Sequence, residues 1–460
     1  MARNRLIRCV LATIAAGALL IAVCLPKQLE IIGPRLGIPA ILVPGDQMQI
    51  SLRASWPLLQ PDWQLSLESA DARYPLTLVE SDGWTPQRRL TVQLPADIPP
   101  AAYALHVAAG SAHKIAEKAV HVLDHYPAEF KIIHIADLPV FGEPGGKGEA
   151  QMTKLVEEIN IIHPDLVVAS GDIAYGASHA NYQTLYDFFL QINAPLVVGP
   201  GNHEFEAWNG YLEYFRQRYH TVKFGFWQII TLDSSHRRDQ LTWSQLRWLN
   251  EVLDAHGDAP SLVNIHHPLF EDRGLQFNVD RIMQALSEHG VHLVLAGHNH
   301  GDRLFDNQGQ RRLDTWDLPG PLNIVTTSAG AKIYPKQSDS PLHHGYRLVR
   351  INGDRVTDFT YDYDGDGKRD ASASIPVDHL NLTQTGAGRA QLENRLHESF
   401  HRVRMQIHAA SPDLKPNRGK LISVQPVEEG FLYTVELPVL QAGQTITVRL
   451  IRHTQPGLPS

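Results

Sequence analysis

The chain has 460 residues, of which 43% are hydrophobic and 20% charged, and its formal net charge is −8. It is too long for one hydrophobic core, because single cores stop growing at roughly 250 to 300 residues, so two or three domains are expected. The composition is that of a soluble globular protein. The negative charge argues against a general affinity for nucleic acid or for anionic membranes.

The first 27 residues predict an export signal or a short membrane anchor. Arginines precede an uncharged run from Cys9 to Leu25, and Pro26 and Lys27 end it. The run has signal-peptide length and also lies near the lower limit of the roughly 17 to 25 residues that span a bilayer. A cleaved signal, an uncleaved anchor through residues 9–25 and, from the weak pattern before Cys24, a lipoprotein are therefore open alternatives. All three place the body outside the cytoplasm, in the periplasm or anchored to the inner membrane.

Both cysteines of the chain, Cys9 and Cys24, lie within this first segment. We therefore expect the exported body to fold without disulfides, which exported proteins often but not always carry. Its stability would then come from its hydrophobic cores and from bound metal.

Residues 37–125 predict a small β-sandwich of the Ig or fibronectin type. Apolar and polar residues alternate in short stretches, which are separated by turn residues such as Pro99-Pro100. The apolar positions include Leu90, Val92 and Leu94, then Tyr103, Leu105 and Val107. No cluster of candidate ligands lies in this segment, so we expect it to act as a spacer or as a lid on the substrate side.

Residues 128–362 predict an α/β domain, because strands and helices alternate after Tyr126-Pro127. Strands are expected at residues 131–136, 166–170, 196–200, 228–233, 262–266 and 291–296. Helical spacing links Met152, Leu155, Val156 and Ile159, and Thr242 with Gln245 forms a capping-box pattern. Gly257 and Gly290 stand where helix ends favour glycine.

The chain returns to strands between residues 323 and 362, and residues 374–460 predict a second β-sandwich. The link at residues 362–373 follows part of the EF-hand calcium loop. Its acidic positions 1, 3, 5 and 9 are Asp362, Asp364, Asp366 and Asp370, and position 6 is Gly367. Position 12, usually glutamate, is Ala373. Weak calcium binding and a solvated acidic turn are both open.

Polar side chains follow five of the expected strands at the point where each ends. They are Asp137; Asp172 and Tyr175; Asn202, His203 and Glu204; His266 and His267; and His298, Asn299 and His300. Functional groups gather at the carboxyl ends of parallel strands. Carboxylates, a phenol, an amide and imidazoles suit two adjacent ions of iron, zinc or manganese, with Asp172 as the best bridge. We expect Gly171, Gly201 and Gly297 to let the backbone turn sharply beside these ligands.

Four blocks together resemble the calcineurin-like metallophosphoesterase superfamily: Gly171-Asp172, Gly201-Asn202-His203-Glu204, Val263-Asn264-Ile265-His266 and Gly297-His298-Asn299-His300. The resemblance covers about half the chain and implies a four-layer α/β/β/α domain flanked by the two β-domains. Most members begin with Asp-x-His, whereas this chain has Asp137-Leu138-Pro139. The block from Gly171 to Tyr175 looks like the purple acid phosphatase form, in which a tyrosine binds the ferric ion in place of that histidine.

The resemblance also implies a ligand set. One metal would be held by Asp137, Asp172, Tyr175 and His300, and the other by Asp172, Asn202, His266 and His298. His203 matches the family histidine that faces the substrate, where it can protonate the leaving oxygen. His267 has no firm assignment, either to the substrate pocket or to packing. If Pro139 marks a weak metal position, the site is degenerate and Tyr175 only packs.

The expected reaction is hydrolysis of a phosphate ester by a metal-bound hydroxide. Purple-acid-type ligation favours phosphomonoesters, and phosphodiesters stay open. The alternative from another class is a non-catalytic envelope protein that binds phosphate or metal. Candidate pocket residues without a role are Arg237, Arg238, His343 and His344, and the loop at residues 142–148 is positioned to cover the pocket.

Overall fold

The computed structural model describes residues 29–54, 62–82, 86–138, 147–174, 178–205, 208–235, 240–271, 273–312, 320–334 and 342–452. The export segment and four residues named above, Pro139, Tyr175, Arg237 and Arg238, lie outside these ranges. The chain divides into two compact units, Met1–Tyr126 and Pro127–Ser460, at the place where the sequence rhythm changes. Within the described ranges, no helix has the length and apolarity needed to cross a membrane.

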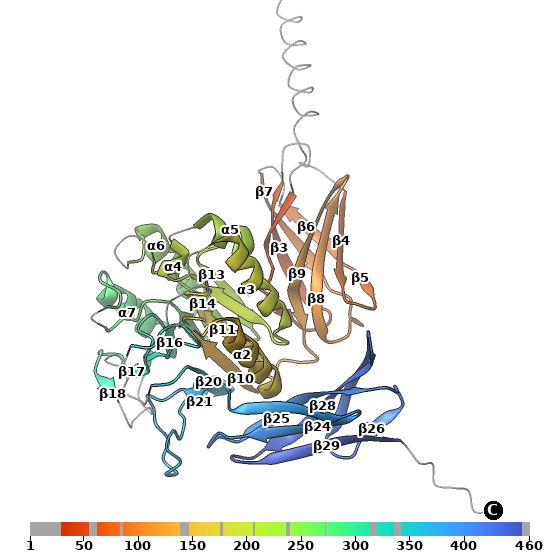
Figure 1. The fold of residues 1–460 in the computed structure, drawn as a ribbon. Coiled ribbons are helices and arrows are strands. Elements are labelled where there is room, and N and C mark those ends of the chain that lie inside the picture. Colours follow the sequence, from red (N-terminus) through yellow and green to blue (C-terminus); the bar gives the residue numbers. More distant parts are fainter. Residues whose placement is uncertain are drawn as a thin grey trace, which may run out of the picture. The chain divides into compact units, whose positions relative to one another are not determined.

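The first unit consists of two β-sheets that share one core (Figure 1). One sheet has the order β1 (Leu29–Gly33), β3 (Gln47–Ala54), β7 (Gln87–Gln93), β6 (Thr77–Asp82). The other has the order β2 (Ala40–Leu42), β9 (Ala112–Val122), β8 (Ala101–Ala109), β4 (Trp63–Glu68), β5 (Arg73–Pro75). Buried and exposed side chains alternate as expected: Met48, Ile50 and Leu52 of β3 are buried, while Gln47 and Gln49 are exposed. The Ig or fibronectin type stays a prediction.

The second unit contains two central sheets. The first has the order β12 (Leu196–Gly199), β11 (Leu166–Ser170), β10 (Glu129–Ile135), β20 (Gly345–Asn352), β21 (Arg355–Asp358), with β22 (Ile375–Pro376) also paired to β20. The second has the order β13 (His220–Phe224), β14 (Trp227–Thr231), β15 (Ser261–Asn264), β16 (Leu293–Ala296), β19 (Leu322–Val325), β17 (Arg303–Phe305), β18 (Arg311–Arg312). Strands β10, β11 and β12 are parallel, as are β14, β15, β16 and β19. Their carboxyl ends therefore face one edge of each sheet.

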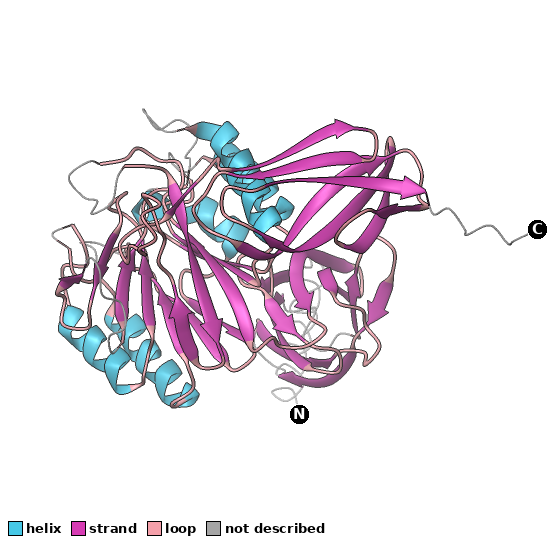
Figure 2. Ribbon diagram, turned by 90° about the horizontal axis from the view of Figure 1, so that it is seen from below, coloured by secondary structure: helices cyan, strands magenta, loops and turns pink. Residues whose placement is uncertain are grey.

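Helices cover the outer faces of both sheets (Figure 2). On the first sheet lie α2 (Gly148–Ile162), α3 (His179–Gln191) and α5 (Trp208–Phe215), and α4 (Asn202–Phe205) is a single turn after β12. On the second sheet, α6 (Trp243–His256) and α7 (Val279–Glu288) pack apolar side chains such as Leu249 and Ile282 against Val263. This is the α/β domain that the alternation predicted, with two sheets between two helical layers.

The capping box of α6 forms only in part. The Thr242 hydroxyl accepts a hydrogen bond from the Gln245 N–H at 3.2 Å, as predicted. The Gln245 side chain does not return to Thr242. It pairs with the N–H and the carbonyl of Asp233, both at 2.8 Å, and so ties α6 to the loop after β14.

The C-terminal β-region packs on the α/β domain within the same compact unit. Its sheets have the orders β23 (Leu380–Gly386), β24 (Arg389–Asn394), β29 (Thr445–Arg452), β26 (Leu414–Pro416), and β25 (Phe400–Ala409), β28 (Gly430–Leu440), β27 (Lys420–Val427). The ammonium of Lys131 donates to the carbonyls of Ile162 and His401, and Oε1 of Glu158 in α2 accepts the N–H groups of His379 and Leu380. These bonds connect β10 and α2 of the α/β domain to the C-terminal β-region.

Candidate metal centre

The predicted ligands at the strand ends come together in one cluster. Asp137 and Asp172 stand two residues beyond β10 and β11, and His266 and His298 stand two residues beyond β15 and β16. The parallel strands of the two sheets therefore deliver side chains to the same cluster from both sheets. Asn202, at the start of α4, completes the group next to His266, with its amide oxygen 3.1 Å from the ring.

One nitrogen of His266 lies at the middle of this cluster. Its Nδ1 lies 2.7 Å from the carbonyl of Ser170, which can only accept, so Nδ1 carries the proton. Its Nε2 faces Asp172 Oδ2 at 3.1 Å, Asn202 Oδ1 at 3.1 Å and His298 Nδ1 at 3.2 Å. In the neutral ring Nε2 carries a lone pair, and this lone pair faces those of the Asp172 and Asn202 oxygens. Such a convergence needs a cation at its centre, which fits a metal ion held by these four residues.

The second pair, Asp137 and His300, has the same chemistry. Nδ1 of His300 donates to the carbonyl of Lys332, which leaves Nε2 facing Asp137 Oδ1 at 3.1 Å. Asp137 is fully buried, and His300 is nearly so. The donor set is thus two carboxylates, one amide and three imidazoles, and it suits two iron, zinc or manganese ions. His266 and His300 both turn their proton-bearing Nδ1 to backbone carbonyls.

The electrostatics of the metal-free cluster agree with this geometry. Burial lowers the pKa of His266, but the charge of Asp172 and the hydrogen bond to it raise the pKa to about 9. For His300, burial is likewise outweighed by Asp137, and the pKa is raised to about 9. Burial raises the pKa of Asp172, yet the imidazoles of His266, His203 and His298 hold it below its ordinary value.

Backbone contacts orient both aspartates. The His298 N–H donates to Asp137 Oδ2 at 2.8 Å, and the His203 N–H donates to Asp172 Oδ1 at 3.0 Å. Asp137, Asp172, His298 and His300 all have φ between 47° and 70°, the left-handed region that non-glycine residues seldom adopt. Backbone strain of this kind is typical of functional sites, where the surrounding structure holds it in place.

The glycines beside the ligands act in two ways. Gly171 has a φ of 79°, as the sequence analysis expected for a sharp turn. Gly201 and Gly297 do not have positive φ, so that expectation is wrong for them, and their role is close approach. A Cβ on Gly201 would lie 2.2 Å from Asp172 Oδ1, and one on Gly297 would lie 2.5 Å from Asp137 Oδ2. Neither position has space for a side chain.

Glu204 has a role that the sequence analysis missed. Its fully buried carboxylate accepts four backbone N–H groups, with Oε2 bound to Gly201 and Asp172 and Oε1 bound to Ile173 and Ala174. It therefore holds the loop after β11 against the loop after β12. Glu204 follows His203 directly in the sequence, but three of its four partners, Asp172, Ile173 and Ala174, lie 30 to 32 residues earlier.

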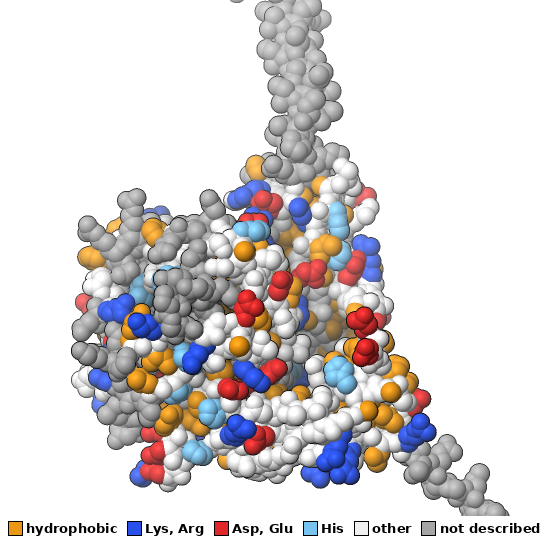
Figure 3. Space-filling model, in the orientation of Figure 1, with side chains coloured by type: hydrophobic (Ala, Val, Ile, Leu, Met, Phe, Trp, Pro, Cys, Tyr) orange, Lys and Arg blue, Asp and Glu red, His pale blue; other side chains and the backbone are white. Residues whose placement is uncertain are grey.

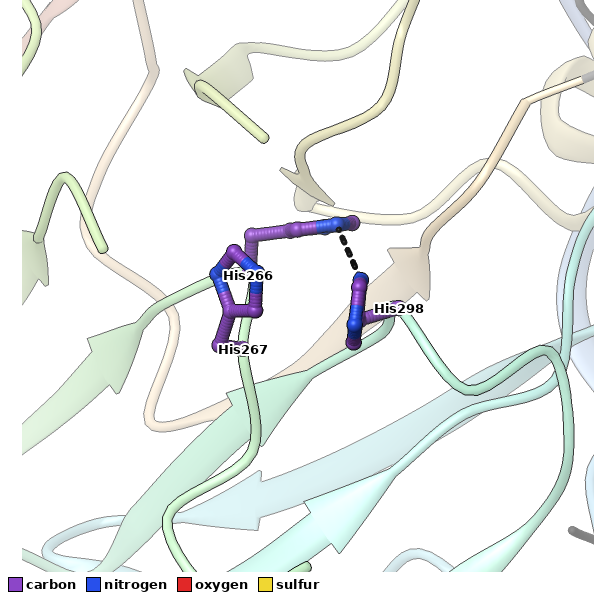
Figure 4. Close-up of side chains that lie close together, drawn as sticks. All are labelled: His266, His267 and His298. Carbon is purple, nitrogen blue, oxygen red and sulfur yellow. Dashed lines mark hydrogen bonds between the residues drawn. The ribbon is translucent and has the colours of Figure 1, made fainter. Parts of the chain in front are cut away.

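His203 and His267 differ in burial and in their partners. The His203 ring is 28% exposed and its Nε2 lies 3.8 Å from Asp172 Oδ2. His267 is buried, its Nδ1 lies 2.9 Å from the Ser234 hydroxyl, and its ring packs 4.2 Å from that of His298 (Figure 4). Side-chain nitrogens of His266, His267 and His298 approach one another closely enough to share one ion. His267 thus stands as a further candidate ligand or as a support for His298.

The remaining candidates lie elsewhere. Tyr175 is outside the described residues. Nε2 of His344 donates to the Ala331 carbonyl at 2.9 Å, whereas His343 turns to Ser374 and stacks on Tyr363. In the acidic link, carboxylates of Asp362, Asp364 and Asp366 gather, but Asp370 accepts the Tyr363 N–H. Calcium binding there stays a prediction.

Comparison with known proteins gives one consistent result. A family model described as calcineurin-like phosphoesterase matches residues 130–302. The 3',5'-cyclic adenosine monophosphate phosphodiesterase of Escherichia coli K12 is 32% identical over 206 residues, which cover 41% of this chain and 71% of that protein. The enzyme of the same name from Pseudomonas aeruginosa is 27% identical over 267 residues, 52% of this chain and 94% of that protein.

Two further similarities have lower coverage or lower identity. A glycerophosphodiester phosphodiesterase of Enterobacter lignolyticus is 32% identical over 160 residues, 30% of this chain and 56% of that protein. Among solved structures, purple acid phosphatase PPD1 from yellow lupin (Lupinus luteus) seeds aligns with 76% of this chain and 70% of its own, at 11% identity and a TM-score of 0.43. That structural similarity is too low to carry an argument.

Proposed function

Because this chain belongs to the calcineurin-like phosphoesterase family and is a metal-dependent phosphoesterase, we propose that it hydrolyses phosphate monoesters at a two-metal centre. The observation that carries the proposal is the convergence of Asp172, Asn202 and His298 on one nitrogen of His266. A second group, Asp137 with His300, lies beside it and is joined to it through the Asp137 to His298 hydrogen bond.

The residues fit two ions in the way that the motifs imply. Asp137, Asp172 and His300, with Tyr175, would hold one ion, and Asp172, Asn202, His266 and His298 the other. We propose iron at the first position and iron, zinc or manganese at the second. When bound, two such ions neutralise the phosphoryl oxygens and lower the pKa of a coordinated water. Carbonyls of Ser170 and Lys332 keep the ligand nitrogens of His266 and His300 turned toward the ions.

His203 is the residue that we propose to protonate the leaving oxygen. Its ring is partly exposed, so a substrate can reach it, and its backbone is fixed by the hydrogen bond to Asp172. A positioned general acid contributes roughly 10² to 10⁴ in rate. A protein that only stores metal or phosphate has no need of such an acid, which favours catalysis over the non-catalytic alternative.

A second candidate is phosphodiester hydrolysis at the same centre. The observation in its favour is that the similar curated proteins carry phosphodiesterase names. The monoester proposal rests instead on the purple-acid-type block from Gly171 to Tyr175 and on Pro139, which replaces the usual histidine. On the face shown in Figure 3, basic and acidic side chains intermingle among the described residues.

The test compares 4-nitrophenyl phosphate with bis(4-nitrophenyl) phosphate on the metal-loaded chain, each with unmutated protein and with His203→Ala. Monoester hydrolysis that is lost in a variant retaining its metals supports the proposal. Turnover of the diester alone moves the assignment to a phosphodiesterase. If neither ester is hydrolysed with two ions bound, the catalytic proposal fails and a binding role takes its place.

We also propose that the body is exported, on the basis of the arginines and the apolar run in residues 1–27. Protease added to intact spheroplasts would then degrade the body of the protein. Protection of the whole chain until the cells are lysed would contradict export.

A further inference from the structure

A cavity of about 420 Å³ lies where the α/β domain meets the C-terminal β-region, inside one compact unit. One wall is the last part of α2 and the turn after it, with Glu157, Asn160, Ile161 and His163. The other wall is the sheet β25–β28–β27, and α2 ends beside β25 (Figure 1). None of its described lining residues is a ligand of the proposed metal centre. Its volume is that of a small-molecule site, roughly 300 to 1,000 Å³. We refer to it as the polar cavity.

The sheet wall of the polar cavity presents a row of hydrogen-bonding side chains. Gln406 of β25 lies opposite Thr434 of β28, which lies opposite Ser423 of β27. Met405 and Ile407, on either side of Gln406, are buried in the sandwich core, so the row stands on the outer face of the sheet. In the described part of the chain, the polar side-chain atoms of these three residues make no hydrogen bond. They are therefore available to a ligand.

A β-bulge in β27 adds an apolar side chain to this wall. The register with β28 shifts between Leu421 and Ser423, so Ile422 is an extra residue in that pairing. Ile422 and Ser423 therefore both line the polar cavity, although neighbours in a regular strand point to opposite faces. Ile161 of α2 and Leu382 of β23 provide further apolar contacts. Apolar surface thus lies between hydrogen-bonding groups.

The charged side chains of the polar cavity have partners of opposite charge. Nε of Arg404 lies 3.2 Å from a carboxylate oxygen of Glu436, and the Lys154 ammonium lies 3.2 Å from that of Glu157. Burial lowers the pKa of His163 to about 3, and the charge of Arg404 adds to this effect, so the ring is neutral at physiological pH. The balance of charge at these groups favours a ligand without net charge.

The chemistry of the walls narrows the ligand further. The backbone of β28 is paired on both sides, with β25 and with β27, so a peptide cannot bind here by adding a strand. The side-chain amides of Gln406 and Gln425 each carry both donors and an acceptor. Sugar hydroxyls also both donate and accept, and the C–H groups of a sugar ring are apolar. A sugar therefore matches both features of the polar cavity.

We propose that the polar cavity binds a neutral carbohydrate, so that the C-terminal β-region carries part of a glycan-binding site separate from the metal centre. Gln406, Thr434 and Ser423 form hydrogen bonds with sugar hydroxyls, and Ile161 and Ile422 contact the C–H face of the ring. The inference does not depend on the reaction at the metal centre.

Saturation-transfer difference NMR on the Zn²⁺-loaded full chain tests the proposal without requiring turnover. The probes are three neutral trisaccharides, namely maltotriose, cellotriose and N,N′,N″-triacetylchitotriose, and N-acetyl-trialanine amide serves as a neutral peptide of similar size. We expect at least one trisaccharide to receive saturation and to give a measurable dissociation constant. The peptide should receive none.

Matched variants locate the binding. Gln406→Ala combined with Thr434→Val should weaken binding roughly fivefold or more, since each neutral hydrogen bond contributes roughly a factor of two to ten. The control is Gln391→Ala combined with Thr447→Val. Gln391 and Thr447 lie opposite each other on β24 and β29, on the outer face of the other sheet, and do not line the polar cavity. The control should bind as unmutated protein does.

A second pair of variants fills space instead of removing hydrogen bonds. Ser423→Tyr places a large ring in the polar cavity on a strand that accommodates aromatic residues, and should abolish binding. Thr447→Tyr is its control and should not affect binding. Bound zinc and circular dichroism should be the same in all variants and in unmutated protein, which shows that the fold is retained.

The outcomes decide the inference independently of the reaction. Binding of a trisaccharide that is weakened by Gln406→Ala/Thr434→Val and by Ser423→Tyr, but not by their controls, supports the glycan site even if no phosphate ester is hydrolysed. Failure of all three trisaccharides to bind overturns it. Equal binding by the cavity variants and their controls, or binding of the peptide in place of the trisaccharides, overturns it as well.

Discussion

Replacing Glu204 with glutamine should disrupt the metal centre without touching a metal ligand. Each oxygen of the Glu204 carboxylate accepts two backbone N–H groups, and all four come from the loops that carry Asp172 and Asn202. Glutamine keeps one accepting oxygen and places an NH₂ donor against the other two N–H groups. Two buried amides then lack an acceptor, at roughly 1 to 3 kcal/mol each, or about 2 to 6 kcal/mol in total.

Glu158→Gln is the matched control. Glu158 is equally buried, but only its Oε1 accepts backbone N–H groups, those of His379 and Leu380. Glutamine can keep that oxygen in place, so the expected loss is below about 1 kcal/mol. The two variants make the same chemical change at two buried glutamates that differ in how many of their oxygens the backbone uses.

Hydrogen exchange measured by mass spectrometry follows the affected amides directly. In Glu204→Gln, the peptide that contains residues 171–174 should exchange roughly 30-fold to 10⁴-fold faster, since about 1.4 kcal/mol corresponds to a factor of ten. Metal content should fall below two ions per chain. In Glu158→Gln, exchange at residues 171–174 and metal content should match those of unmutated protein. Unchanged exchange and two bound ions in Glu204→Gln would refute the assigned role of this carboxylate.

Three further predictions concern the centre itself. Gly201→Ala should lower metal affinity at least tenfold, because the new Cβ would lie 2.2 Å from Asp172 Oδ1; competition with a chelator measures this, and undiminished affinity would argue against close packing. Metal affinity should rise with pH up to about 9, because ions must displace protons from His266 and His300, whose pKa values are raised to about 9; a flat profile from pH 6 to 9 would contradict this. The same raised pKa values stabilise the metal-free fold below about pH 6.5, and this contribution should be lost as the pH rises through 9. Tyr175→Phe should abolish a violet absorption band of the iron-loaded protein while leaving two ions bound, and persistence of the band would remove Tyr175 from the ligand set.

The sequence could predict the α/β domain and the clustering of its ligands for one physical reason. Parallel strands place their carboxyl ends at one edge, so residues such as Asp172 and His266, nearly a hundred positions apart, meet wherever strands β11 and β15 end. Short continuous apolar runs then located these strands to within a few residues, because each is buried on both faces. The family resemblance supplied the roles, and the comparisons support the family.

Other features depend on contacts that no local pattern encodes. Glu204 acts through backbone N–H groups of a distant loop, and every residue has such groups, so sequence gives no signal for its partners. Gly201 and Gly297 resemble turn glycines in sequence, and only the adjacent aspartates show that space is the constraint.

The most direct test of the two-metal account is a titration of metal-free full-length protein with Mn²⁺ or Zn²⁺, in which bound metal and hydrolysis of 4-nitrophenyl phosphate are followed together. Asp172→Asn is compared under the same conditions, because Asp172 is the proposed bridge between the ions. The account predicts that hydrolysis appears as the second ion binds, and that the variant binds fewer ions and loses turnover. Full hydrolysis without metal, or two ions and normal turnover in Asp172→Asn, would contradict it.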